Sequence, residues 1–283
     1  MRNIALVGAL ALVAAAGSAQ AAIDTASPAQ IALGNFAVQT SETSFGGGNS
    51  LANAKAEIVG GNLNMLFGGR LNTGFERLMI MFDTKAGGAN APAFVDGANV
   101  GGMVLDAGFD ADYAYILNGD GGTMYINRTT YDFAGNGAGN YVGQVGWANG
   151  GGDVPAGGSE NGERASVNNQ GAGLPFGFNF LDGAGLATAA GYNTGMGFSV
   201  PLSALDLGPA PSFFDVFVVI LGGDGSTLST QALGGVGNSI GGYGGIGGVN
   251  FNNIPGNQFF SVPTPGAAAL LGLGGLLAGR RRR

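Results

Sequence analysis

Short apolar and β-branched runs recur along the chain, each bounded by Gly, Asn or Asp. This pattern predicts strands, because strands are short and end at turn-forming residues, whereas a helix needs a 3.6-residue period over about ten residues or more. One short helical turn is expected at 202–207, after Pro201. The expected strands are 36–40, 54–59, 63–67, 77–83, 113–117, 123–133, 141–147, 197–202, 214–221, 227–233 and 258–262.

Two of these runs, 77–83 and 214–221, are almost continuously apolar, which predicts central strands that are buried on both faces. Two tracts, 149–173 and 234–248, are dense in glycine and are expected to form long solvated loops. Glycine loses much conformational entropy on ordering and offers no side chain to bury. The predicted fold class is therefore all-β, a β-sandwich or jelly roll with long Gly-rich loops.

The N-terminus follows the three-part pattern of a secretory signal peptide. Arg2 supplies the positive charge, residues 4–16 are apolar, and Ala19-Gln20-Ala21 is a small-x-small cleavage site before Ala22. A permanent membrane anchor is the alternative, but it needs about twenty apolar residues. The expected partners are the secretory translocon and signal peptidase, and the mature chain starts at residue 22.

The C-terminus combines a proline-rich break, a short apolar run and a basic block. The apolar run 266–279 would span only about 21 Å as a helix, against about 30 Å for a bilayer core. The alternative is a buried last helix of the folded domain, although four arginines are an unusual end for one. The expected sorting residues are Pro263, Thr264, Pro265, Gly266, Arg280, Arg281, Arg282 and Arg283.

This tail resembles the sorting signal of the PEP-CTERM family, with Thr264 where that family has Glu. The resemblance implies export, processing by an exosortase-like enzyme, transient membrane anchoring through the tail, and release to or retention at the cell surface. It divides the chain into a signal peptide (1–21), an exported domain (22–261) and a tag (262–283), with short apolar helices at both termini.

The formal charge is −7, but Arg2 and the four terminal arginines are five of the eleven basic residues. The exported domain keeps six basic against eighteen acidic side chains, a net charge of −12. Such a domain repels nucleic acid and anionic headgroups. The chain has no cysteine and no histidine, which excludes disulfides and histidine-based catalysis. Carboxylate chemistry, binding of a hard cation, or surface recognition remain, and no enzyme is expected.

A second resemblance extends over much of the exported domain. The segments 61–66, 71–78, 82–88 and 108–113 look like the core of exported β-sandwich proteins of planctomycete-like bacteria. Their general relatives are DOMON-type and family-nine carbohydrate-binding sandwiches, in which a strand ending in Asp precedes a Gly-rich turn. The resemblance implies a sandwich fold and carries over no ligand-binding residue.

Three aspartates, Asp106, Asp110 and Asp112, form the polar group of greatest interest. Carboxylates two residues apart can point the same way and share a Ca²⁺ ion, so calcium is the one cofactor considered. The alternative is that Asp106 and Asp110 end turns while Asp112 faces water. A glycosidase pair is possible in principle, because two carboxylates at a suitable separation suffice. A sequence does not reveal that separation.

Aromatic residues give a second candidate site. Exposed rings stack on sugars while Asp and Asn bind the hydroxyls, and the possible glycan contacts are Trp147, Tyr131 and Tyr141. The alternative is that these rings are core or cross-strand partners. The sequence thus favours an exported, non-catalytic cell-surface or matrix protein with a structural or interaction role. A carbohydrate-binding module that recognises an extracellular polysaccharide is the alternative.

Overall fold

The computed structural model describes residues 35–38, 49–71, 74–120, 123–146, 162–168, 195–208, 213–233 and 244–263 of the 283-residue chain. These residues form strands and short 3₁₀ helices. The strands are β1 (Asn35–Val38), β2 (Ser50–Val59), β3 (Asn62–Arg70), β4 (Gly74–Asp83), β5 (Tyr113–Asp120), β6 (Thr123–Tyr131), β7 (Gly137–Gly146), β8 (Arg164–Asn168), β9 (Gly195–Pro201), β10 (Phe213–Leu221), β11 (Thr227–Ala232), β12 (Gly244–Gly245) and β13 (Phe259–Pro263). The 3₁₀ helices are η5 (Leu202–Leu205), η7 (Ile246–Gly248) and η8 (Phe251–Asn253).

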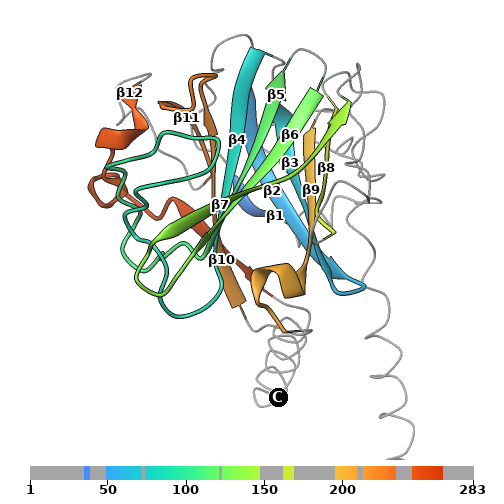
Figure 1. The fold of residues 1–283 in the computed structure, drawn as a ribbon, viewed down its shortest axis with the longest axis horizontal. Coiled ribbons are helices and arrows are strands. Elements are labelled where there is room, and N and C mark those ends of the chain that lie inside the picture. Colours follow the sequence, from blue (N-terminus) through green and yellow to red (C-terminus); the bar gives the residue numbers. More distant parts are fainter. Residues whose placement is uncertain are drawn as a thin grey trace, which may run out of the picture.

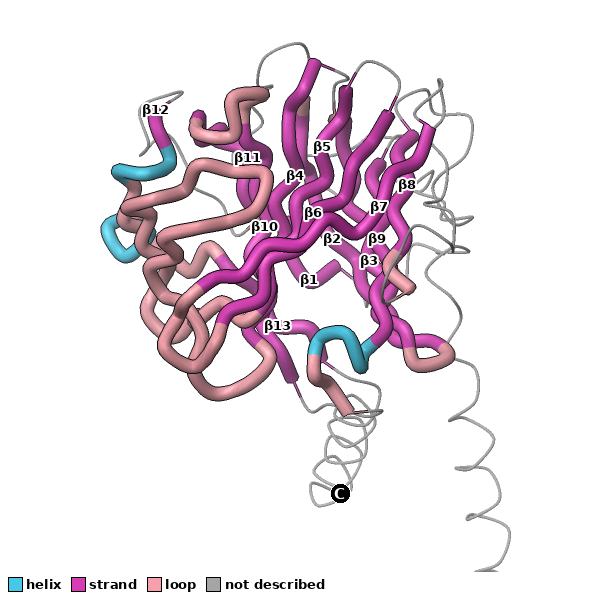
Figure 2. Tube along the Cα trace, viewed as in Figure 1, coloured by secondary structure: helices cyan, strands magenta, loops and turns pink. Residues whose placement is uncertain are grey.

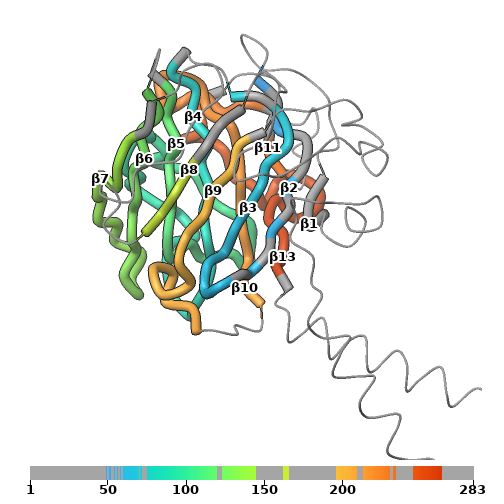
Figure 3. Tube along the Cα trace, turned by 90° about the vertical axis from the view of Figure 1, so that its right-hand side faces the viewer, coloured from blue at the N-terminus to red at the C-terminus, as the bar shows by residue number. Residues whose placement is uncertain are grey.

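The strands form two antiparallel sheets in two layers (Figures 1 and 3). The smaller sheet has five strands in the order β1–β2–β3–β9–β8. The larger sheet has eight strands, in the order β12–β11–β10–β4–β5–β6–β7, with β13 also paired to β10. This arrangement confirms the predicted all-β sandwich. The helical turn expected after Pro201 is also confirmed, as η5.

One apolar core fills the space between the two sheets. Phe82 on β4 lies at its centre, with its ring centroid 6.0 Å from that of Tyr115, 6.4 Å from Phe198 and 6.5 Å from Phe214. Phe198 belongs to β9 of the smaller sheet, so this contact joins the two layers. Burying one side chain of this size stabilises a fold by about 1.5–3 kcal/mol.

A second apolar core lies on the other face of the larger sheet. Loop segments 84–112 and 246–258 cover that face, and Figure 2 shows these loops over the part of the sheet near β10 and β11. We call them the outer loop layer. Phe109 and Phe251 from these segments both pack against Phe217 of β10, with centroid distances of 6.3 and 5.1 Å. The molecule therefore has three layers, two sheets and one of loops.

The strands β4 and β10 are buried on both faces, as their continuous apolar sequence predicts. They pair along their length, with Ile80 opposite Val218 and Met79 opposite Val219. The first pair faces the core between the sheets and the second faces the outer loop layer. All four side chains are buried. Burial on both faces thus depends on loops as well as on the second sheet.

The expectation of solvated loops in the glycine tracts is wrong for part of each tract. Residues 164–168 form β8, which pairs with β9. Residues 244–248 form β12 and η7, and Ile246 within them is fully buried. Glycine is needed here for close approach: a Cβ on Gly102 would lie 2.2 Å from the carbonyl oxygen of Gly247. Two backbone segments pack directly against each other, so glycine density did not mark an absence of packing.

The boundary at residue 261 also needs correction. The last strand, β13, runs to Pro263, which pairs with Phe213, and Val262 is buried in the core between the sheets. Val262 and Pro263 thus belong to the sandwich, because both extend a ladder that fills the core. The expected signal peptide, the other expected sorting residues and both expected terminal helices lie outside the described residues.

Candidate functional site

Several acidic residues gather at one end of the larger sheet. Asp83 ends β4 and lies opposite Asp215 on β10. The backbone N–H of Asp110 donates a hydrogen bond of 3.0 Å to Oδ2 of Asp83. Burial raises the pKa of Asp83 to about 6. The hydrogen bond from the Asp110 N–H lowers the pKa, whereas the neighbouring Asp112, Asp215 and Asp110 carboxyl groups raise it further. Asp83 therefore exchanges its proton only about one pH unit below neutral.

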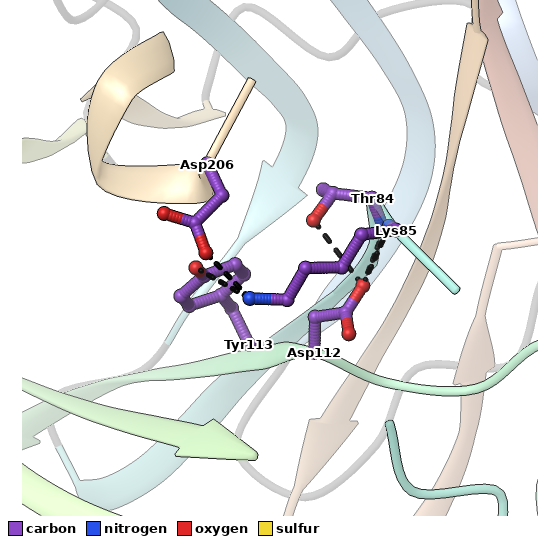
Figure 4. A network of polar contacts seen from close by, with 5 residues as sticks. All are labelled: Thr84, Lys85, Asp112, Tyr113 and Asp206. Atoms are coloured by element: carbon purple, nitrogen blue, oxygen red, sulfur yellow. Dashed lines mark hydrogen bonds and ion pairs between the residues drawn. The ribbon is translucent and has the colours of Figure 1, made fainter. Parts of the chain in front are cut away.

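Asp112 closes the start of the long β4–β5 loop. Its Oδ2 accepts hydrogen bonds from the backbone N–H groups of Thr84 (2.7 Å) and Lys85 (2.9 Å) and from the Thr84 hydroxyl (3.2 Å), as Figure 4 shows. Burial nevertheless raises the pKa of Asp112. The Lys85 ammonium reaches Asp206 at 2.5 Å and Tyr113 at 3.4 Å (Figure 4). This network ties the larger sheet to η5, the turn that follows β9.

Asp106 has a separate structural role. Its Oδ2 accepts a hydrogen bond of 2.6 Å from the backbone N–H of Gln258, which joins the two segments of the outer loop layer just before β13 begins. Burial raises the pKa of Asp106. Among the described residues, which include Asp106, Asp110 and Asp112, no three acidic side chains are close enough together to hold a metal ion. The predicted calcium site gains no support from this geometry.

An aromatic and amide face lies on β5, β6 and β7, on the same side of the larger sheet as the outer loop layer. Strand pairing places Tyr125 opposite both Asn118 and Gln144, and Asn127 opposite Tyr141. Met124 and Ile126 point into the core between the sheets, so Tyr125 and Asn127 point outward. We call Asn118, Tyr125, Asn127, Tyr141 and Gln144, together with Phe94, the tyrosine face.

Tyr141 is the most exposed tyrosine among the described residues, at 48%. Its hydroxyl donates a hydrogen bond of 3.1 Å to Oε1 of Gln144. Its pKa is raised, first by partial burial and second by the nearby Tyr125 hydroxyl. The two tyrosines are therefore diagonal neighbours on one surface, where cross-strand side chains come within contact of each other.

The outer loop layer adds an aromatic ring to this face. Phe94 is 45% exposed and lies beside Gly139 of β7, where an added Cβ would be 3.0 Å from the ring atom Cε1. Asp96 lies there too, and its Oδ2 accepts a hydrogen bond of 3.0 Å from the Asn127 amide. Because Gly139 has no side chain, loop and strand together form one surface.

The sequence predicted Tyr131 and Tyr141 to act alike, and the structure separates them. Tyr131 is 4% exposed, and its hydroxyl donates a hydrogen bond of 2.8 Å to the carbonyl of Phe94. Burial raises its pKa strongly. Its assignment as a possible glycan contact is wrong, because it supports the Phe94 loop from within the core. Trp147 lies outside the described residues.

A buried polar group between the sheets was missed from the sequence. Glu163 is 0% exposed, and its Oε1 accepts hydrogen bonds of 3.2 Å from both the Tyr115 hydroxyl and the Arg128 guanidinium. Tyr115 and Arg128 belong to the larger sheet, whereas Glu163 comes directly before β8 of the smaller one. The group joins the sheets. Glu163 stands in a glycine tract, where no periodic pattern marked it as buried.

Comparison with known proteins gives no assignment: the sequence matches no protein-family model, no curated protein and no solved structure. Within the part of the chain that the structure describes, no helix is both long enough and apolar enough to cross a membrane.

Proposed function

We propose that the protein is exported and acts at the cell surface or in the extracellular matrix as a non-catalytic structural or interaction protein. The observation that carries the proposal is the position of the last described strand, β13. Val262 is a core residue and Pro263 is the last residue of β13, while the apolar run of the tail begins at Gly266. Only Thr264 and Pro265 separate the sandwich from a segment of the kind that sorts proteins at membranes.

This short separation supports a specific route. The secretory translocon and signal peptidase would act on residues 1–21, and the tail would then hold the folded sandwich directly against the membrane. The terminal arginines would stay on the cytoplasmic side, as basic residues next to apolar segments do. An exosortase-like enzyme would process the tail and leave the sandwich at the surface.

The experiment that tests this route changes only the charge of the tail. Replacement of Arg280, Arg281, Arg282 and Arg283 by serine is expected to cause mis-sorting or premature release, measured by cell fractionation and by the size of the mature protein. The same four positions changed to lysine are the matched control, because lysine keeps the charge and should keep the sorting. A serine variant that is displayed and processed like the wild type would contradict the proposal.

Carbohydrate recognition is the second candidate. It is favoured by the tyrosine face, where Tyr141 is exposed beside Tyr125 and side-chain amides lie next to both rings. Aromatic rings combined with amide groups are the side chains that recognise sugars in water. Such recognition is compatible with the first proposal, since a surface or matrix protein meets polysaccharides where it is displayed.

A further inference from the structure

The tyrosine face is a surface held rigidly on three paired strands. Tyr125 lies on β6, Tyr141 and Gln144 on the neighbouring β7, and Asn118 on β5. Residues on neighbouring strands keep a fixed spacing of about 5 Å across a pair and about 7–8 Å along a diagonal. Rings held in this way need little ordering when a ligand stacks on them, and this lowers the cost of binding.

A polar atom on this face has an unused hydrogen-bonding capacity. Oδ1 of Asn118 is buried and, among the described residues, has no hydrogen-bond partner. Asn118 lies directly opposite Tyr125. An acceptor in this position costs stability unless something donates to it. The Asn118 residue as a whole is partly exposed, so a rotation of its amide would let a hydroxyl group of a bound ligand, placed against the Tyr125 ring, supply that donor.

Phe94 extends the aromatic surface in the direction of the outer loop layer. Its ring lies over Gly139, two residues before Tyr141 on β7, and its backbone is fixed by the hydrogen bond from Tyr131. Three aromatic residues, Phe94, Tyr141 and Tyr125, therefore follow one another across the face. Amide groups of Asn127 and Gln144 lie beside them. This alternation of rings and amides suits a chain of repeating units more than a single small molecule.

The charge of the protein indicates which class of polymer would bind. The exported domain has a net charge of −12, and the charged side chain placed beside Phe94 is the acidic Asp96. An anionic polymer would be repelled. A neutral sugar polymer matches the surface, because the apolar faces of its rings stack on aromatic side chains and its hydroxyls bind amides.

We infer that the tyrosine face binds a neutral polysaccharide, with Tyr141 and Tyr125 as the stacking residues and Asn118 and Gln144 as hydrogen-bonding residues. The inference rests on the second candidate function and adds to it a location and a ligand class. In this inference the polysaccharide contacts Phe94, Tyr125 and Tyr141, and not the buried Tyr131.

The test is affinity electrophoresis of the purified full chain through gels containing neutral polymers (amylose, laminarin, mannan or xyloglucan) or the anionic polymer alginate. Retardation is expected in at least one neutral gel and not in alginate. Tyr141→Ala and Tyr125→Ala should each weaken binding at least tenfold, and Gln144→Ala should weaken it less. Phe213→Ala is the matched control, because Phe213 is an aromatic strand residue with 54% exposure on another strand, β10.

Melting curves of each variant check that it folds, and the exposed Tyr141 and Gln144 positions keep the test valid if Tyr125→Ala is unstable. The inference is overturned if no neutral polymer retards the protein, if alginate alone does so, or if Tyr141→Ala and Gln144→Ala bind like the wild type. These outcomes are separate from failure of the proposed function, because export and sorting are measured by fractionation and do not depend on the tyrosine face.

Discussion

Asp83 and Asp215 occupy directly paired positions on the neighbouring strands β4 and β10, so two carboxyl groups share one end of the larger sheet. Asp215 is also bound by the hydroxyl of Ser261 on β13. Asp83 is half-buried, and its pKa is about 6 instead of the ordinary 3.8. Protonation of Asp83 thus removes both the cost of burying its charge and its repulsion from neighbouring carboxylates.

This pairing predicts how stability changes with pH. The folded protein binds the Asp83 proton more tightly than the unfolded chain does, so this contribution to stability is full below about pH 4 and is lost as the pH rises through about 6. Asp83→Asn should be more stable than the wild type at pH 7 and should show a flatter decline between pH 4 and 6. Urea unfolding midpoints across this range measure the effect.

Asp132→Asn is the control for that experiment. Asp132 is exposed, and hydrogen bonds from Asn136 lower its pKa, so its contribution to stability is lost only as the pH falls below the ordinary range. This variant should keep the decline between pH 4 and 6. Some decline should also remain in Asp83→Asn, since burial raises the pKa of Asp106 and Asp112 as well. Equal slopes in Asp83→Asn and the wild type would contradict the prediction.

The pair formed by Ile80 and Val218 tests the central position of β4 and β10. Both side chains are fully buried between the sheets. Ile80→Asp or Val218→Asp would bury an unpaired carboxylate, which should cost several kcal/mol and unfold a marginally stable domain. Ala138→Asp, at an exposed position of β7, should change stability by about 0.5 kcal/mol or less. Circular dichroism melting curves distinguish these outcomes, and similar damage at both kinds of site would refute the arrangement.

Gly102 and Gly108 provide a matched test of the outer loop layer. Both have φ of +92°, so alanine at either position suffers the same backbone strain, about 1–2 kcal/mol. An added Cβ at Gly108 meets nothing within 4 Å, whereas one at Gly102 lies 2.2 Å from the Gly247 carbonyl oxygen. Gly102→Ala should therefore be clearly less stable in urea than Gly108→Ala. Equal stability of the two variants would show that the loops do not pack as described.

Glu163 tests the buried polar link between the sheets. Glu163→Ala would leave the Arg128 guanidinium without its buried carboxylate, and loss of one partner of a buried ion pair costs about 3–5 kcal/mol. Tyr115→Phe removes a single neutral donor and should cost about 1 kcal/mol. Thermal unfolding measures both. A change below 1 kcal/mol in Glu163→Ala would mean that the link contributes little.

Removal of divalent metal tests the calcium hypothesis directly. Oδ2 of Asp106 and Oδ2 of Asp112 already accept hydrogen bonds from backbone N–H groups. We therefore expect the same melting curve with and without a chelator, for the wild type and for Asp110→Asn. A lower melting temperature in chelator, abolished by Asp110→Asn, would instead restore the calcium site, because a ligand that binds only the folded state stabilises it.

The sequence by itself determined most of the strands, because their signal is local, but it missed β8 and β12, which lie in the glycine tracts. A short apolar run ended by turn residues identifies a strand wherever it lies, and the continuous runs in β4 and β10 also indicated burial on both faces. The turn η5 followed from Pro201 in the same way. For the same reason the order of residues at the C-terminus predicted a sorting tail, although β13 extends into the predicted tail as far as Pro263.

Only the tertiary structure decided which faces are covered, since cover comes from residues distant in sequence. Tyr131 and Tyr141 look alike in sequence. Tyr131 is buried and hydrogen-bonded to the Phe94 carbonyl, whereas Tyr141 is exposed. Glu163 becomes buried because Tyr115 and Arg128 lie on the facing sheet. The Gly247 backbone packs only because Gly102 approaches it from another loop. Non-local contacts of this kind leave no period in the sequence, and they determine which side chains remain available to a ligand.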